Sequence, residues 1–235
     1  MAVQNSLTQQ KTGGTEVTYI ANGEEVRLSS SMIRKYLVSG DAANVTDQEV
    51  MMFLTLCKYQ HLNPFLREAY LVKYGNNPAT IVTGKDTFTK RAERNDKYKG
   101  KAAGIIVQKK DGTIEQREGT LHLKDETIVG GWAKIFIKDR EPEMTTVSFD
   151  EYVGKKKDGS ISGQWLAKPA TMIRKVAVVQ ALREAFPEDF GGIYSPEEVG
   201  GEVAENIPDK DVPVVVEEAK VVEQPKKDAA DVLFE

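Results

Sequence analysis

Apolar residues occur on almost every side of the segment that follows Pro169. At about 100° per residue they cover nearly the full circumference of a helix, so this helix is expected to be buried on most sides. Pro169 suits the first turn of a helix, and Pro187 marks the end of the segment. The pattern predicts a long buried helix near residues 169–186, with these apolar positions: Met172, Ile173, Val176, Ala177, Val178, Val179, Ala181, Leu182 and Ala185.

Shorter elements precede this helix. Thr46 followed by Glu49 is a capping-box pattern, and the apolar spacing after it predicts a helix over residues 47–60. Two strand-like runs flank the turn residues Gly75-Asn76-Asn77-Pro78, which is typical of a hairpin with an exposed polar tip. We expect short or medium elements at these positions: a helix at 32–38, a turn at 62–65, strands at 69–74 and 80–83, and a helix at 85–95.

The middle of the chain reads as a run of strands. The expected strands span residues 102–109, 113–118, 119–123, 132–138 and 145–149. Helices beside a meandering antiparallel sheet indicate an α+β fold. We therefore expect an antiparallel sheet with a hairpin, packed against helices, in a domain over residues 29–199. A flexible N-terminal arm over residues 1–28 and an acidic disordered tail over residues 200–235 complete the expected organisation.

The strand over residues 132–138 alternates in a way that leaves two interpretations. Ala133, Ile135 and Ile137 fall on one face, which we assign to the core. Trp132, Lys134, Phe136 and Lys138 fall on the other face. They either bind bases and phosphates, or the aromatic rings meet helices while the lysine stems extend to solvent.

Charge divides the chain unevenly. The formal net charge of −4 combines a basic middle with an acidic end, because residues 51–195 carry 24 basic and 18 acidic side chains and residues 196–235 carry 4 basic and 12 acidic ones. A basic domain with an acidic tail suits a protein that binds a polyanion.

The buried helix itself carries cations. Arg174, Lys175 and Arg183 need partners, because an unpaired buried cation costs several kcal/mol. One interpretation is internal pairing with Glu184, Glu188 or Asp189. The other is an external polyanion, which is favoured by Lys168 and the run Lys155, Lys156 and Lys157 on the N-terminal side of the helix.

Several classes of chemistry lack their signatures. Cys57 is the only cysteine, and His61 and His122 are too isolated to suggest a zinc site. The chain has no phosphate-binding Gly-x4-Gly-Lys-Ser/Thr motif, and its carboxylates are scattered. No apolar run of membrane-spanning length and no signal peptide is present, so we expect a soluble cytoplasmic protein with no membrane contact. These features favour binding over catalysis, so we expect a protein that is not an enzyme.

Several motifs together resemble the RecT/Bet family of bacteriophage single-strand annealing proteins. The resemblance covers roughly residues 46–199, in the family's order. The matching stretches are Leu62-Asn63-Pro64-Phe65 with Arg67-Glu68-Ala69-Tyr70, Val82-Thr83-Gly84-Lys85-Asp86-Thr87-Phe88, Trp165-x3-Pro169-x2-Met172, Gln180-Ala181-x-Arg183-x-Ala185-Phe186, and Gly192-Ile193-Tyr194. One departure is Ala170, where some relatives carry lysine directly after the motif proline; Lys168 is a candidate substitute.

The resemblance implies ATP-independent annealing of complementary DNA strands in phage recombination. Family members form rings or helical filaments that hold single-stranded DNA and the annealed duplex intermediate in a basic groove. They act beside a phage exonuclease and host replication proteins such as the single-strand-binding protein. No cofactor is implied, although Mg²⁺ could serve as a counterion of the DNA. The predicted DNA-binding residues are Lys85, Lys90, Arg91, Lys99, Lys101, Lys134, Lys155, Lys156, Lys157, Trp165, Lys168, Arg174, Lys175 and Arg183, with Asn76 and Asn77 near the bases.

Two other classes of protein remain open at this point. A metal-dependent nuclease, or another DNA enzyme of the same recombination module, would degrade DNA with magnesium. A phage structural or scaffold protein would assemble without DNA and ignore strand complementarity.

Overall fold

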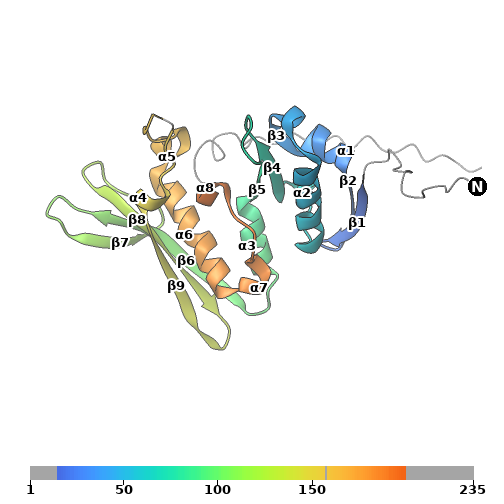
Figure 1. Ribbon diagram of the computed structural model, residues 1–235. Helices are drawn as coiled ribbons and strands as arrows, with labels where there is room; N and C mark the ends of the chain where they lie inside the picture. Colours follow the sequence, from blue (N-terminus) through green and yellow to red (C-terminus); the bar gives the residue numbers. More distant parts are fainter. Residues whose placement is uncertain (1–14, 157, 200–235) are drawn as a thin grey trace, which may run out of the picture.

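The computed structural model describes residues 15–156 and 158–199 and shows an α+β fold (Figure 1). Its sheets, in which all strand pairs but one are antiparallel, pack against helices, as predicted. The N-terminal part contains β1 (Glu16–Ala21), β2 (Glu24–Ser29), α1 (Ser30–Met32), the π-helical η1 (Ile33–Leu37), β3 (Val38–Gly40), η2 (Ala42–Asn44), α2 (Asp47–Tyr59), η3 (Pro64–Leu66), β4 (Ala69–Lys73) and β5 (Thr80–Thr83). The rest comprises α3 (Lys85–Glu93), β6 (Tyr98–Gln108), β7 (Ile114–Glu118), β8 (Thr127–Ile137), β9 (Arg140–Ser148), α4 (Phe149–Tyr152), α5 (Gly163–Ala167), α6 (Pro169–Ala185), α7 (Pro187–Phe190) and α8 (Pro196–Val199).

The first described element is an antiparallel hairpin, not a flexible arm. β1 and β2 meet at Asn22 and Gly23, whose φ angles of 57° and 85° are those of a type I′ turn. Tyr19 and Leu28 are buried, and the Tyr19 hydroxyl donates to the Leu62 carbonyl at 2.7 Å. The expectation of a flexible arm over residues 1–28 is therefore wrong for residues 16–28. Residues 1–14 lie outside the described part, as does the predicted acidic tail over residues 200–235.

Helix α2 begins as its sequence predicts. The Thr46 side chain accepts from the Glu49 backbone N–H at 3.2 Å, and the Glu49 carboxylate accepts from the Thr46 N–H at 2.8 Å. Val50, Phe53, Leu54 and Cys57 form its buried face. The capping box thereby fixes both the start of α2 and the direction of its apolar side.

The largest sheet has the strand order β7-β6-β8-β9, with every neighbouring pair antiparallel. Helix α6 lies on one face of this sheet (Figure 1), and Ala133 and Ile135 of β8 are fully buried there. Gly131 permits the close approach, because a Cβ at that position would lie 2.7 Å from the Ile173 carbonyl oxygen. The expected strand over residues 119–123 is wrong, since the chain leaves the sheet at Gly119, where φ is 82°.

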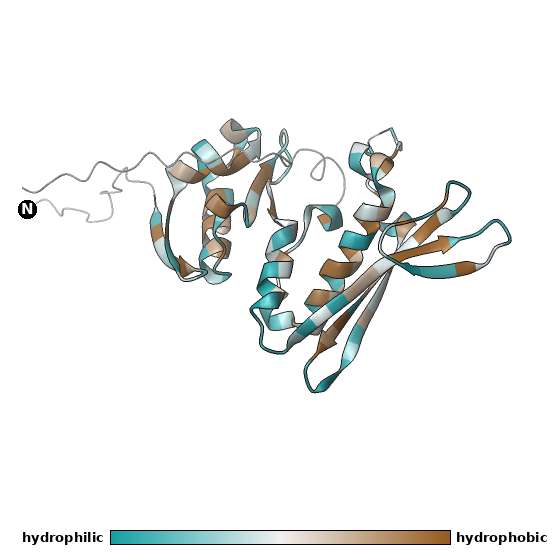
Figure 2. Ribbon diagram, turned by 180° about the vertical axis from the view of Figure 1, so that it is seen from behind, coloured by the Kyte–Doolittle hydropathy of each residue, from teal (hydrophilic) through white to brown (hydrophobic). Residues whose placement is uncertain are grey.

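The predicted long helix is α6, and it is buried on most sides. Ten of its residues are buried, including Val176, Ala177 and Leu182, and apolar positions run along it and the strands beneath it (Figure 2). Pro187 ends α6 and also opens α7. The N-terminal part joins this unit through a 2.8 Å bond from the Thr83 N–H to the Tyr194 carbonyl, and α3 packs on α7 through stacked Phe88 and Phe190 rings, 5.8 Å apart.

Candidate nucleic-acid interface

Helix α6 carries two cations on the side that faces α8. Lys175 and Arg183 lie eight residues apart, which places them on neighbouring faces about two turns from one another. Figure 1 shows α8 between α6 and the β5–α3 region. The Lys175 ammonium is 2.8 Å from Glu197, and an Arg183 guanidinium nitrogen is 2.7 Å from Glu198.

Arg183 is held from several directions. Its Nη2 donates to both Glu198 carboxylate oxygens, at 2.7 and 2.8 Å, and to the Ile193 carbonyl at 3.3 Å. Its guanidinium lies 4.6 Å from the centre of the Tyr194 ring. The Glu198 side chain is only 5% exposed and also accepts from the Ser195 N–H at 2.9 Å. The ion pair therefore belongs to the interior of the fold.

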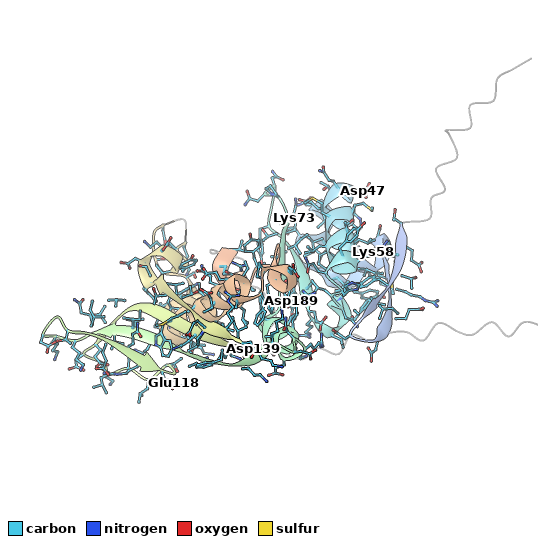
Figure 3. All side chains as sticks on the ribbon, turned by 90° about the horizontal axis from the view of Figure 1, so that it is seen from below. Asp47, Lys58, Lys73, Glu118, Asp139 and Asp189 are labelled. Atoms are coloured by element: carbon cyan, nitrogen blue, oxygen red, sulfur yellow. The ribbon has the colours of Figure 1, made fainter. Side chains whose placement is uncertain are left out.

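The internal partners differ from those that the sequence suggested. Glu184 accepts from the Thr145 hydroxyl at 2.6 Å, and Asp189 accepts from the Asn95 amide at 2.6 Å. Figure 3 labels Asp189 near the middle of the molecule. The expectation of Glu184, Glu188 or Asp189 as the partners of Lys175 and Arg183 is corrected to Glu197 and Glu198.

Arg174 and Lys101 also point into the packed region between α6 and β6. The Arg174 Nε donates to the Ala103 carbonyl at 3.1 Å and so ties the helix to the strand. Burial lowers the pKa of Lys101, and the nearby Arg174 charge acts in the same direction, whereas Glu93 opposes it. Both cations are half-buried, which limits their access to a ligand.

Trp165 is a core residue in this structure. Its side chain is 1% exposed and its ring meets that of Phe149 edge-on, with centroids 5.7 Å apart. Gly154 leaves room for it, because a Cβ there would lie 2.8 Å from the indole. A base could stack on this ring only after the surrounding residues moved, so the DNA contact of Trp165 stays a prediction.

An exposed basic group lies beside the N-terminus of α6. Lys155, Lys156 and Lys168 are exposed and form no ion pair within the described part of the chain. The backbone around Lys155 and Lys156 is held by an antiparallel β-bridge between Lys155 and Ile161. A 2.8 Å hydrogen bond from the Lys156 N–H to the Ser160 carbonyl adds to it. Lys157 lies outside the described residues. We call Lys155, Lys156 and Lys168 the exposed lysine group.

The β4–β5 tip, residues 75–78, is held at both ends by carboxylates. The Gly75 N–H donates to Asp41 at 2.6 Å, and the Ala79 N–H donates to Glu49 at 2.6 Å. Glu49 also pairs with Lys73 at 2.7 Å, and these bonds lower the Glu49 pKa to about 2, with the Lys73 bond contributing most. Asn76 and Asn77 are exposed on this anchored tip. Figures 1 and 2 both show the tip and the α5 region on the same side of the molecule.

A second basic segment runs from the end of α3 into β6. Residues 90–101 contain six cations and two acids; Lys90 and Lys99 are exposed, and Arg91 donates to the Gln60 carbonyl. Lys85 is the first residue of α3, and its side chain is outside the described set. Sequence reasoning missed Arg94 and Lys97, although the same density of cations pointed to them.

Arg91, Arg94 and Lys97 line a cavity of about 490 Å³ between the β1–β2 hairpin and α3. Glu68, Asp96 and Asp189 line it too, so the charges in this cavity are mixed. Burial lowers the pKa of Arg91, and the Asp189 charge opposes that effect. The acids make the cavity less suited to a phosphate than the exposed lysine group.

Among the described residues, no helix covers the second face of the large sheet (Figure 1). Phe136 is 38% exposed there, Lys134 Nζ lies 5.8 Å from its ring centre, and the Trp132 indole donates to the Arg117 carbonyl at 3.1 Å. The interpretation in which Trp132 and Phe136 meet helices is therefore wrong. The alternation that placed Ala133, Ile135 and Ile137 in the core is confirmed.

Within residues 15–156 and 158–199, no three His, Cys, Asp or Glu side chains are grouped so that they could hold a metal ion. None of the helices in that same part combines the length and the apolarity that a membrane crossing requires.

Comparison with known protein families decides the assignment. The family model described as the RecT family matches residues 23–212. The chain belongs to the RecT family. It is also 30% identical over 166 residues to an uncharacterized protein of Ureaplasma parvum, an alignment that covers 69% of this chain and 65% of that protein.

The chain spans 65% of the length of this relative, and the match to the RecT family covers residues 23–212. The predicted DNA-binding residues fall into two groups. Arg174, Lys175 and Arg183 are embedded in internal contacts, whereas the exposed lysine group is free of ion pairs in the described structure.

Proposed function

We propose that this RecT-family protein binds single-stranded DNA and anneals complementary strands without ATP. The protein acts as an oligomer, a ring or a helical filament, in which each subunit grips the phosphate backbone. Base pairing supplies the specificity of annealing, so the protein needs only a sequence-independent grip.

The observation that carries the proposal is the exposed lysine group on the same side as the anchored β4–β5 tip. Lys155, Lys156 and Lys168 form no ion pair within residues 15–156 and 158–199, so they can contact a phosphate without breaking one there. A strand that follows these lysines passes α8 and reaches the tip, as the arrangement in Figure 1 suggests.

The tip suits a role beside the bases. Asn76 and Asn77 carry amides that donate and accept hydrogen bonds, and Asp41 and Glu49 fix the backbone on which they stand. A rigid tip holds the bases without paying to order a loop at each encounter. One strand held extended with its base edges accessible lowers the entropic barrier to pairing.

Oligomerisation supplies the affinity that one subunit lacks. A subunit offers a few phosphate contacts, and an array along one strand adds them together through a high effective concentration. The partners of this reaction are single-stranded DNA, the annealed duplex intermediate and further copies of the chain. A phage exonuclease supplies the single strands, and the host single-strand-binding protein occupies the same DNA. Mg²⁺ acts only as a counterion.

The experiment mixes two complementary oligonucleotides with purified protein, without ATP, and follows duplex formation by fluorescence while light scattering sizes the complexes. We expect faster pairing and large protein–DNA assemblies. Mismatched oligonucleotides of equal length are the control, and they should show assembly without pairing. Intact, unpaired DNA beside monomeric protein would refute the proposal. Degraded DNA in the presence of Mg²⁺ would favour a nuclease, and assemblies indifferent to DNA would favour a scaffold.

A further inference from the structure

A row of cations runs along one side of α6. Lys168 directly precedes α6, and Lys175 and Arg183 follow on the helix at intervals of seven and eight residues, which places Arg183 about 80° around the helix from Lys175. Lys168 is exposed at the start of this row, but Lys175 and Arg183 are covered by α8 and paired with its carboxylates. The three cations therefore follow one another along the helix, but only Lys168 is exposed at the surface.

Helix α8 is held on α6 by these pairs, by the burial of Pro196 and by the bond from the Thr83 N–H to the Tyr194 carbonyl just before it. It is a single turn of four residues, Pro196–Val199, and a helix of that length has no stability of its own. Glu198 caps its start through the Ser195 N–H and pairs with Arg183 at the same time. The two ion pairs are the charged part of the contact between α8 and α6, and this is the part for which a polyanion competes.

The pairing is also incomplete. Glu197 Oε2, Arg183 Nε and Ser195 Oγ are buried without a hydrogen-bond partner in the described structure. Such groups weaken a contact, because each has given up water and received nothing in return. A phosphate offers the same cations several acceptor oxygens and can engage a guanidinium through two parallel bonds.

We propose that α8 is an autoinhibitory clasp that single-stranded DNA displaces from α6. Glu197 and Glu198 occupy Lys175 and Arg183 in the free protein, and backbone phosphates replace these carboxylates when a strand lies across the row. The inference rests on the proposed binding of single-stranded DNA to the Lys155–Lys168 side of the molecule. It adds a step to DNA binding in which phosphates compete with the two carboxylates for the cations. Short or weakly held DNA therefore does not open the clasp.

The test is the double variant Glu197→Gln/Glu198→Gln, which keeps the shape of both side chains and removes their charge. Binding to a fluorescein-labelled oligothymidylate is measured by anisotropy over a series of salt concentrations. We expect roughly 5- to 30-fold tighter binding than in the unmodified protein. The slope of the logarithm of the binding constant against the logarithm of the salt concentration should steepen by about 1 to 1.5, because two more cations reach phosphates.

The matched control is Glu16→Gln/Glu24→Gln, which removes two exposed carboxylates from the β1–β2 hairpin, away from α6. It should change the affinity by less than about 2-fold through its general charge effect. Adding Lys175→Ala and Arg183→Ala to the clasp variant should abolish the gain, whereas a gain that persists without both cations would overturn the clasp. Unchanged or weaker binding by the clasp variant would overturn it as well.

A single Glu197→Gln variant guards against loss of folding. Lys175 is 28% exposed, so its ammonium can hydrate when its partner is neutral. The variant should bind DNA about 3- to 10-fold more tightly and gain more thermal stability from added oligothymidylate than the unmodified protein does. A smaller gain in thermal stability would contradict displacement. If the unmodified protein binds no single-stranded DNA, the proposed function fails; if it binds and the glutamine variants match it, only the clasp fails.

Discussion

The two groups of cations near α6 consist of the same kinds of residue, lysine and arginine, but one group is paired inside the fold and the other is exposed to solvent. Arg183 donates to a carboxylate that is 5% exposed, whereas Lys155, Lys156 and Lys168 stand in solvent without an ion pair in the described part of the chain. In the free protein the embedded Lys175 and Arg183 hold α8 on α6, whereas the exposed group is available to phosphates without any rearrangement. The difference shows that a basic stretch gains its role from the acids that the fold brings to it.

The largest effect should come from the embedded aromatic ring beside the exposed lysines. Trp165→Ala removes a side chain that is 1% exposed, and the resulting cavity should lower the free energy of unfolding by about 3–5 kcal/mol. Urea unfolding followed by circular dichroism measures this loss. Leu166→Ala is the control, since Leu166 is 69% exposed and its loss should cost less than about 0.5 kcal/mol. A stable Trp165→Ala protein with weakened DNA binding would return Trp165 to the interface.

Arg183→Ala tests the embedded cation directly. It leaves the Glu198 carboxylate buried without its partner, which should cost about 3 kcal/mol of unfolding free energy. Lys168→Ala, measured in the same unfolding assay, should stay within about 0.5 kcal/mol of the unmodified protein. Equal stability of the two variants would abolish the distinction between the embedded and the exposed group.

The exposed group is tested by the triple variant Lys155→Ala/Lys156→Ala/Lys168→Ala. The affinity for single-stranded DNA should fall roughly 10- to 50-fold near 0.1 M salt, because three phosphate contacts are lost. The slope of the logarithm of the binding constant against the logarithm of the salt concentration should become shallower by about 2. Unfolding free energy should not change. The control removes three exposed lysines elsewhere, Lys58, Lys110 and Lys124. An equal loss of affinity in the control would mean that only net charge matters.

The smallest effect concerns pH and the carboxylate that anchors the tip. The folded-state pKa of Glu49 is about 2, below its ordinary value of 4.5, so its bonds stabilise the protein fully above pH 4.5 and progressively less as the pH falls toward 2. Glu49→Gln should therefore be less stable than the unmodified protein at pH 7, and the gap should narrow by pH 3. Denaturant midpoints at both pH values measure the gap, and a gap that widens in acid would contradict the assignment.

Local signals in the sequence predicted much of the fold. The capping box at Thr46 and Glu49, the tip at Asn76 and Asn77 and the apolar circumference of α6 each depend on neighbours within a few residues. The β1–β2 hairpin was predictable too, because Asn22-Gly23 between alternating apolar residues is a strong signal for a type I′ turn. The polar composition of the N-terminus concealed that signal.

The candidate site was less accessible to sequence reasoning. Lys175 and Glu197 are 22 residues apart, and only the return of the chain past α7 brings them together. The burial of Trp165 depends on the space left at Gly154 and on the Phe149 ring, which no local pattern encodes. The residues that the sequence placed at the interface were therefore separated into embedded and exposed groups only by long-range packing.

The stacking of Phe88 on Phe190 has a consequence for synthesis of the chain. Phe88 leaves the ribosome about a hundred residues before its partner. At roughly 5–20 residues per second, the apolar side of α3 waits about 5–20 s before α7 covers it. During that interval the apolar side of α3 is exposed and prone to aggregation. A chaperone would contribute most to the yield of native protein in this period.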